Sequence, residues 1–157
     1  MKAKLQILIV TLALIASGCG NRATATPTAE ATLTPDPCAG SALGESIKPI
    51  NDLQREFDDA SALAANLPRE QLSDTITYLQ KIRRAAEDTK PPSCLAALKT
   101  YQLAQMNAVI ETLLAFVGGA DKTALNDGIA KAQASHDQYM LELARLSGAT
   151  VQPTASP

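Results

Sequence analysis

The sequence predicts an all-α protein, folded as an antiparallel up-down-up-down four-helix bundle. Apolar residues recur at steps of three and four in four segments between residues 38 and 147, and this is the spacing of amphipathic helices. Connections of about two to five residues join the segments, and such short connections make neighbouring helices antiparallel. Hydrophobic residues make up 46% of the chain but aromatic residues only 3%, which favours helices with aliphatic cores.

The first helix is expected from about residue 47 to residue 67. Ser46 is the predicted N-cap, which places Pro49 in the first turn, where proline is tolerated. The apolar stripe of this helix consists of Leu43, Ile47, Ile50, Leu53, Phe57, Ala60, Ala64 and Leu67.

The second helix is expected to begin around Pro68 and to end before Pro91 and Pro92. Proline suits a first helical turn, and the residue before a proline is driven to extended geometry. The apolar stripe consists of Leu72, Ile76, Leu79, Ile82 and Ala86.

Ser93 is the predicted N-cap of the third helix, which ends at Gly118 and Gly119 because glycine provides an unstrained left-handed exit. Its stripe contains one polar residue, Gln102. The stripe consists of Leu95, Leu98, Gln102, Met106, Val109, Leu113 and Phe116.

Asp121 is the predicted N-cap of the fourth helix, and Gly148 closes it. Gly128 inside this helix costs about 1 kcal/mol relative to alanine, so we expect the first turn to fray or the helix to begin nearer Ile129. The stripe consists of Leu125, Ile129, Ala132, His136, Tyr139, Leu143 and Leu146. A three-helix bundle with a loose first segment is the alternative fold.

The N-terminal residues 1–18 have the charge order of a secretory signal peptide. Two lysines precede an apolar run from Leu5 to Ala16, which at about 12 residues is short for a membrane span. The run continues as Ser17-Gly18-Cys19 and resembles the lipobox of bacterial lipoproteins, although Ala16 stands where leucine is commonest.

The resemblance implies that Cys19 becomes the first residue of the mature chain. It then carries a diacylglyceryl thioether, and often a third, amide-linked chain such as palmitate, and two or more chains hold a protein stably in a bilayer. The implied location is the extracytoplasmic face of the cell membrane. The alternatives are an uncleaved membrane helix and an ordinary secretory signal with Cys19 unmodified.

Residues 19–37 are predicted to form a disordered linker between the lipidated cysteine and the folded domain, residues 38–147. The linker is rich in Ala, Thr and Pro and has no periodic apolar pattern. The tail, residues 148–157, has a similar composition, so we expect it to be disordered as well.

Two cysteines remain besides Cys19, and we expect Cys38 and Cys94 to form a disulfide. The secretory signal implies an oxidising compartment. Cys38 precedes the first helix and Cys94 opens the third, so the predicted topology places both at the same end of the bundle. Two free thiols are the alternative.

The sequence contains no recognisable catalytic motif, and its single histidine cannot complete a zinc site, which needs three or four nitrogen or sulfur ligands. The acidic pairs Asp58-Asp59 and Glu87-Asp88 are interpreted as solvent-exposed, because adjacent helical positions point about 100° apart. The net charge is −2, and residues 19–157 contain 12 basic and 16 acidic side chains. This balance excludes a basic nucleic-acid-binding surface.

His136 is the exception in the pattern, because it lies on an apolar stripe. We expect it to share a direct or water-bridged hydrogen bond with Gln102 at a similar height on the third helix. The alternative is that both side chains reach solvent separately at the edge of the stripe. A third hypothesis pairs His136 with Met106 as haem ligands, by analogy with b-type cytochromes of this architecture.

These observations favour a non-enzymatic lipoprotein without a cofactor. We expect a binding or accessory module of the cell envelope whose partners are the lipid bilayer, through acylated Cys19, and an envelope protein. The alternatives are a bundle that carries haem or a metal through His136 and a structural spacer in the envelope.

Overall fold

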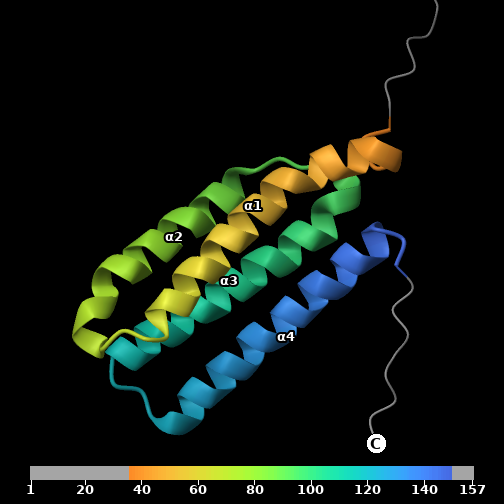
Figure 1. Cartoon of the computed structure of the whole chain (residues 1–157). Helices are drawn as coiled ribbons and strands as arrows, with labels where there is room; N and C mark the ends of the chain where they lie inside the picture. The colour runs from red at the N-terminus through yellow and green to blue at the C-terminus, as the bar shows by residue number, and fades with distance from the viewer. Residues whose placement is uncertain (1–35, 150–157) are drawn as a thin grey trace, which may run out of the picture. The chain divides into compact units, whose positions relative to one another are not determined.

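The structure, a computed structural model, describes residues 36–149. It contains four α-helices, labelled in Figure 1: α1 (Gly40–Ala64), α2 (Leu72–Asp88), α3 (Ala96–Val117) and α4 (Lys122–Leu146). Short 3-10 turns, Arg69–Gln71 and Ser93–Leu95, precede α2 and α3, and residues 36–149 contain no strand. The all-α prediction with four helices is therefore confirmed. The predicted signal peptide, Cys19, nearly all of the linker and most of the tail lie outside the described residues.

The start of α1 differs from the prediction. The helix begins at Gly40, so Ser46 lies inside it and is not the N-cap; the Ser46 hydroxyl instead donates a hydrogen bond to the Pro37 carbonyl oxygen at 3.0 Å. Pro49 is consequently an internal residue with its side chain exposed. The first turns of α1, orange in Figure 1, run at an angle to the remainder, as expected when proline removes a helical hydrogen bond.

Pro68 was expected in the first turn of the second helix and Ser93 as the N-cap of the third, and both expectations are wrong. Pro68 and Pro92 are extended residues that precede the two 3-10 turns, and Ser93 makes no side-chain cap. The predicted end of α2 is confirmed, since Thr89 leaves the helix in an extended conformation. The prolines therefore separate the helices without starting them.

The predicted ends of α3 and α4 are confirmed. Gly119 and Gly148 have φ angles of 80° and 74°, in the left-handed region that favours glycine. Asp121 caps α4, because its Oδ1 accepts a hydrogen bond from the backbone N–H of Ala124 at 2.9 Å. The connection between α3 and α4 is consequently short and well defined.

The main hydrophobic core lies between α1, α2 and α3. Phe57 of α1, Leu79 of α2 and Met106 of α3 are fully buried at its centre. A second cluster joins the end of α1 to the start of α2 and the end of α3, through Ala64, Leu72 and partly buried Phe116. Because α1 supplies the centre of the core, the alternative fold with a loose first segment is wrong.

α4 packs along α3, and Figure 1 shows α3 between α1 and α4. Among the residues of α4 only Tyr139 is buried. It joins a third cluster with Ile50 of α1 and Leu98 of α3. Ile129, expected on the buried stripe, is 59% exposed. The N-terminal half of α4 therefore leaves part of its apolar face uncovered.

Gly128 permits the close approach of α4 to α3. A Cβ atom built on Gly128 would lie 2.3 Å from Oγ1 of Thr112 and 3.2 Å from its Cγ2. α4 begins at Lys122, so the expectations of a frayed first turn or a start near Ile129 are wrong. The cost of glycine in a helix is offset by tighter packing of two helices.

We expect Gly128→Ala to lower the free energy of unfolding by about 1 kcal/mol, because overpacking costs ~1–3 kcal/mol and exceeds the gain in helix propensity. Urea unfolding followed by circular dichroism measures this change. Gly44→Ala is the matched control, since Gly44 is also helical but a Cβ there meets nothing within 4 Å; it should stabilise the protein. Adding Thr112→Ala should rescue Gly128→Ala. Equal stabilisation by both single alanine variants would contradict the packing argument.

Candidate functional site

A groove lies between the C-terminal half of α1 and the N-terminal half of α4. Its volume is about 540 Å³, within the range of small-molecule sites. Residues of α3 form its floor, and most of the lining is apolar. The apolar lining residues include Ala64, Leu67, Val109, Phe116, Leu125 and Ile129.

The groove exists because α4 is fixed at two positions, and the part of α4 between them does not reach α1. Gly128 allows α4 to lie close to α3, while Tyr139 contacts α1 farther along the helix. Two lining residues that face this space, Ala132 of α4 and Ala65 at the end of α1, are small and do not fill it. The uncovered apolar face of α4 therefore forms one wall of the groove.

Three polar side chains form a cluster at the end of the groove nearest Tyr139. Gln54 Nε2 donates to Asp58 Oδ1 at 3.0 Å and to Gln105 Oε1 at 2.6 Å. Gln105 Nε2 also donates to Asp58 Oδ1, at 3.0 Å. Both glutamines are buried, and Asp58 and Gln105 line the groove. A carboxylate is thus held in place by two neutral amides.

Asp58 is the only Asp, Glu, Lys or Arg among the residues that line the groove, and His136 is the only other ionisable one. No ion pair formed within residues 36–149 involves it. The interpretation of Asp58-Asp59 as a solvent-exposed pair is correct for Asp59, but wrong for Asp58, which is half-buried. The reason is that Asp58 turns toward α3, where Gln105 meets it.

Tyr139 marks where the groove ends. Its hydroxyl donates a hydrogen bond to Asn51 Oδ1 at 2.5 Å and so connects α4 with α1. Burial, together with the nearby Asp58 charge, raises the pKa of Tyr139 to about 12. The folded protein therefore favours the neutral phenol.

This pKa shift predicts a loss of stability at alkaline pH. An unfolded tyrosine has a pKa near 10, so the stabilisation is fully present below about pH 10 and disappears as the pH rises through about 12. Tyr139→Phe should abolish this loss, remove the titration step near pH 12 in phenolate absorbance, and cost about 1 kcal/mol at neutral pH through the lost hydrogen bond.

Tyr78→Phe is the matched control for this titration. The pKa of Tyr78 is also raised, by its hydrogen bond to Glu56, but its phenol is exposed. The step near pH 12 should survive this substitution. An absorbance curve unchanged in Tyr139→Phe would refute the assignment.

His136 lines the groove, and its buried Nδ1 has no hydrogen-bond partner among residues 36–149. The expected direct hydrogen bond with Gln102 is not formed: Gln102 Nε2 donates to the backbone carbonyl of Ile50 at 2.8 Å, and its Oε1 has no partner in the part of the chain that the structure describes. Separate contact with solvent is wrong for Gln102, which is fully buried. Met106 lies in the core beside Phe57 and is not among the groove residues. The structure therefore does not bring His136 and Met106 to one cavity. Within residues 36–149, no three His, Cys, Asp or Glu side chains lie close enough together to hold a metal ion.

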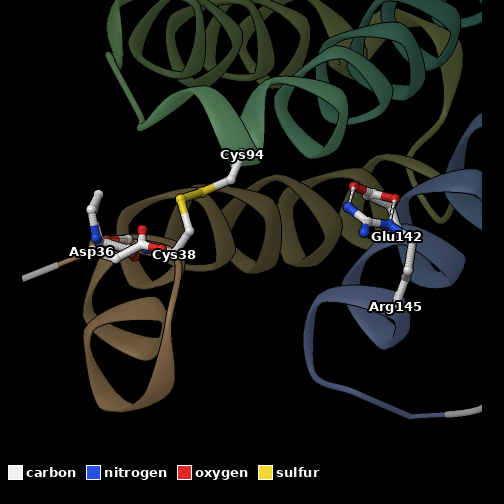
Figure 2. The surroundings of a disulfide bond; sticks show 7 residues. Asp36, Cys38, Cys94, Glu142 and Arg145 are labelled. Carbon is white, nitrogen blue, oxygen red and sulfur yellow. Dashed lines mark hydrogen bonds and ion pairs between the residues drawn. A yellow bond between two sulfur atoms is a disulfide. The ribbon is translucent and has the colours of Figure 1, made fainter.

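The predicted disulfide between Cys38 and Cys94 is confirmed, with the two Cα atoms 6.2 Å apart. It joins the segment before α1 to the 3-10 turn before α3, as Figure 2 shows. Asp36 Oδ1 accepts a hydrogen bond from the backbone N–H of Cys38 at 2.8 Å. Cys94 packs against the cluster that contains Tyr139, so the disulfide stabilises the end of the bundle away from the groove.

Comparison with known proteins gave no significant match, whether to family models, to curated proteins or to solved structures. None of the helices within residues 36–149 is long and apolar enough to cross a membrane.

Proposed function

We propose that this protein is a lipid-anchored extracytoplasmic module that binds the apolar part of a ligand in the groove between α1 and α4, and that it is not an enzyme. The observation that carries the proposal is the groove itself, about 540 Å³ in volume with a mainly apolar lining. Ile129 lies on its wall and is 59% exposed. Large apolar side chains exposed in a concave site are typical of ligand-binding surfaces.

The proposal includes an antiparallel up-down-up-down arrangement of the helices. The short connections support it, in particular the four residues 118–121 between α3 and α4. In a regular bundle of this kind, α4 packs against both α3 and α1. Here the separation of α4 from α1 along half its length creates the binding site.

The proposal also places the domain outside the cytoplasm, attached through lipid on Cys19. The support is the signal-like segment 1–18 and its resemblance to a lipobox. A linker rich in Ala, Thr and Pro would allow the domain to reach a ligand or an envelope protein near the bilayer. The disulfide is compatible with an oxidising compartment.

Titration calorimetry with hexan-1-ol, a neutral probe with a short apolar chain, tests the groove. The mature chain is held in lipid nanodiscs, and the heat measured with empty nanodiscs is subtracted. Hexan-1-ol should bind saturably, and Ile129→Asp should abolish binding because it introduces a charge on the apolar wall. Leu141→Asp is the matched control, since Leu141 is an exposed residue of α4 outside the groove. Equal effects of the two variants, or no saturable binding, would refute the proposal.

A further inference from the structure

We propose that the groove selects organic cations, namely amines with an apolar body whose ammonium group pairs with the Asp58 carboxylate. This inference rests on the proposed function, because it assumes that the groove is the binding site. It adds the charge of the ligand and the residue that recognises it.

The charge of the groove is the first argument. Asp58 is the only Asp, Glu, Lys or Arg among the lining residues, and His136 is the only other ionisable one. The carboxylate is held by Gln54 and Gln105, which carry no charge. A half-buried carboxylate beside apolar walls attracts a cation more strongly than one in open water, because the local dielectric constant is lower. The same charge repels an anionic ligand. The groove is therefore complementary to a positively charged group.

The hydrogen bonds at this end of the groove are the second argument. The amide nitrogen of Gln54 donates to Asp58 and Gln105, whereas its buried Oε1 has no partner in the described part of the chain. Nδ1 of His136, which can accept a hydrogen bond when the ring proton is on Nε2, is also buried without a partner among residues 36–149. At least one buried acceptor at this end of the groove, Gln54 Oε1, therefore has no donor. An ammonium group supplies three donors and no acceptor.

The layout of the groove gives the orientation of the ligand. From Asp58 to Ala65, both lining residues of α1, the helix advances about 10 Å at 1.5 Å per residue. An apolar body extending over this length would contact Ala64 and Leu113 and reach Phe116. At that far end, the Arg69 guanidinium lies over the Phe116 ring, 4.8 Å from its centroid. The positive charge of Arg69 favours placing the ammonium at the opposite end, on Asp58.

Three probes with the same chain test the inference: hexylammonium, hexan-1-ol and hexanoate. Each is titrated by calorimetry into the mature chain in nanodiscs at neutral pH and low salt, with empty nanodiscs subtracted. Hexylammonium should bind at least tenfold more tightly than hexan-1-ol, because a hydrogen bond to a charged group contributes more than a neutral one. Hexanoate should bind more weakly than hexan-1-ol. This comparison uses the unaltered protein and does not depend on the folding of a variant.

Asp58→Asn identifies the residue responsible. In this variant the affinity for hexylammonium should lie within about twofold of the affinity for hexan-1-ol, because the charge that distinguishes the two probes is gone. Asp59→Asn is the matched control: it removes the same charge from the neighbouring residue, which is exposed and outside the groove, and should leave all three affinities unchanged.

Three outcomes would overturn the inference: hexanoate binding as tightly as hexylammonium, equal affinities for hexylammonium and hexan-1-ol, or a loss of selectivity in Asp59→Asn as large as in Asp58→Asn. In each of these cases saturable binding of hexan-1-ol that is sensitive to Ile129→Asp would show that the groove still binds ligands. Failure of the inference is therefore distinguishable from failure of the proposed function.

Discussion

Loss of the Cys38–Cys94 disulfide is expected to lower the free energy of unfolding by about 4 kcal/mol. The two cysteines are 56 positions apart, and the chain-entropy treatment assigns this value to a loop of that length. The total free energy of unfolding of a small domain is only about 5–15 kcal/mol, so losing the disulfide should lower the melting temperature markedly. Urea unfolding of the mature chain with and without reductant, followed by circular dichroism, measures the difference.

The double variant Cys38→Ser/Cys94→Ser is the control for this experiment. It should be as unstable as the reduced protein and should not respond to reductant. The circular dichroism of the folded state should change little, because the disulfide lies beside the helices and not within α1 or α3. Two free thiols in the unfolded, unreduced protein would contradict the disulfide and the placement of both cysteines at one end of the bundle.

The positions of the helices were largely predictable, because they depend on local patterns. The apolar stripe of α2 was predicted residue by residue, and every member of it is buried. The start of α1 was not predictable from Ser46 and Pro49, since the additional turns are held by tertiary features. Those features are the disulfide at Cys38 and the hydrogen bond from Ser46 to Pro37. Periodicity indicates which residues face the core, but contacts distant in sequence decide where the helix begins.

The groove was not predictable, because it depends on the distance between helices and not on the pattern within one. Ile129 and His136 were both assigned to the stripe of the fourth helix, and both line the groove. The pattern could not show that the N-terminal half of α4 would remain apart from α1. Gly128 was the available signal, since a glycine inside a long helix indicates close packing against a neighbour, here Thr112.

The polar cluster at the end of the groove corresponds to a weaker signal in the sequence. Ile50, Gln54 and Asp58 follow one another at steps of four along the first helix, so all three lie on one side of it. Gln105 lies three residues after Gln102 on the third helix. These spacings place polar side chains next to a buried stripe. Only the packing of α1 on α3 determines that Gln54, Asp58 and Gln105 meet.

Cys19→Ser is expected to abolish lipid attachment completely, because the proposed attachment depends on one sulfur atom. Each acyl chain contributes about 0.8 kcal/mol per buried methylene group, and two chains hold a protein where one is marginal. The wild-type protein from its native host should fractionate with membranes and carry the mass of the acyl chains. The variant should carry no acyl mass and should be recovered either as a soluble chain or as an uncleaved precursor.

The Cys38→Ser/Cys94→Ser variant separates anchoring from stability in the same fractionation. The two replaced cysteines form the disulfide and take no part in the proposed lipid attachment. The variant should therefore remain in the membrane fraction with full acyl mass even though it unfolds more easily. Intact-mass measurement decides the matter, because an uncleaved precursor can remain in the membrane through residues 1–18 without any lipid. A soluble mature wild-type species without acyl mass would overturn both the lipid attachment of Cys19 and the proposed location.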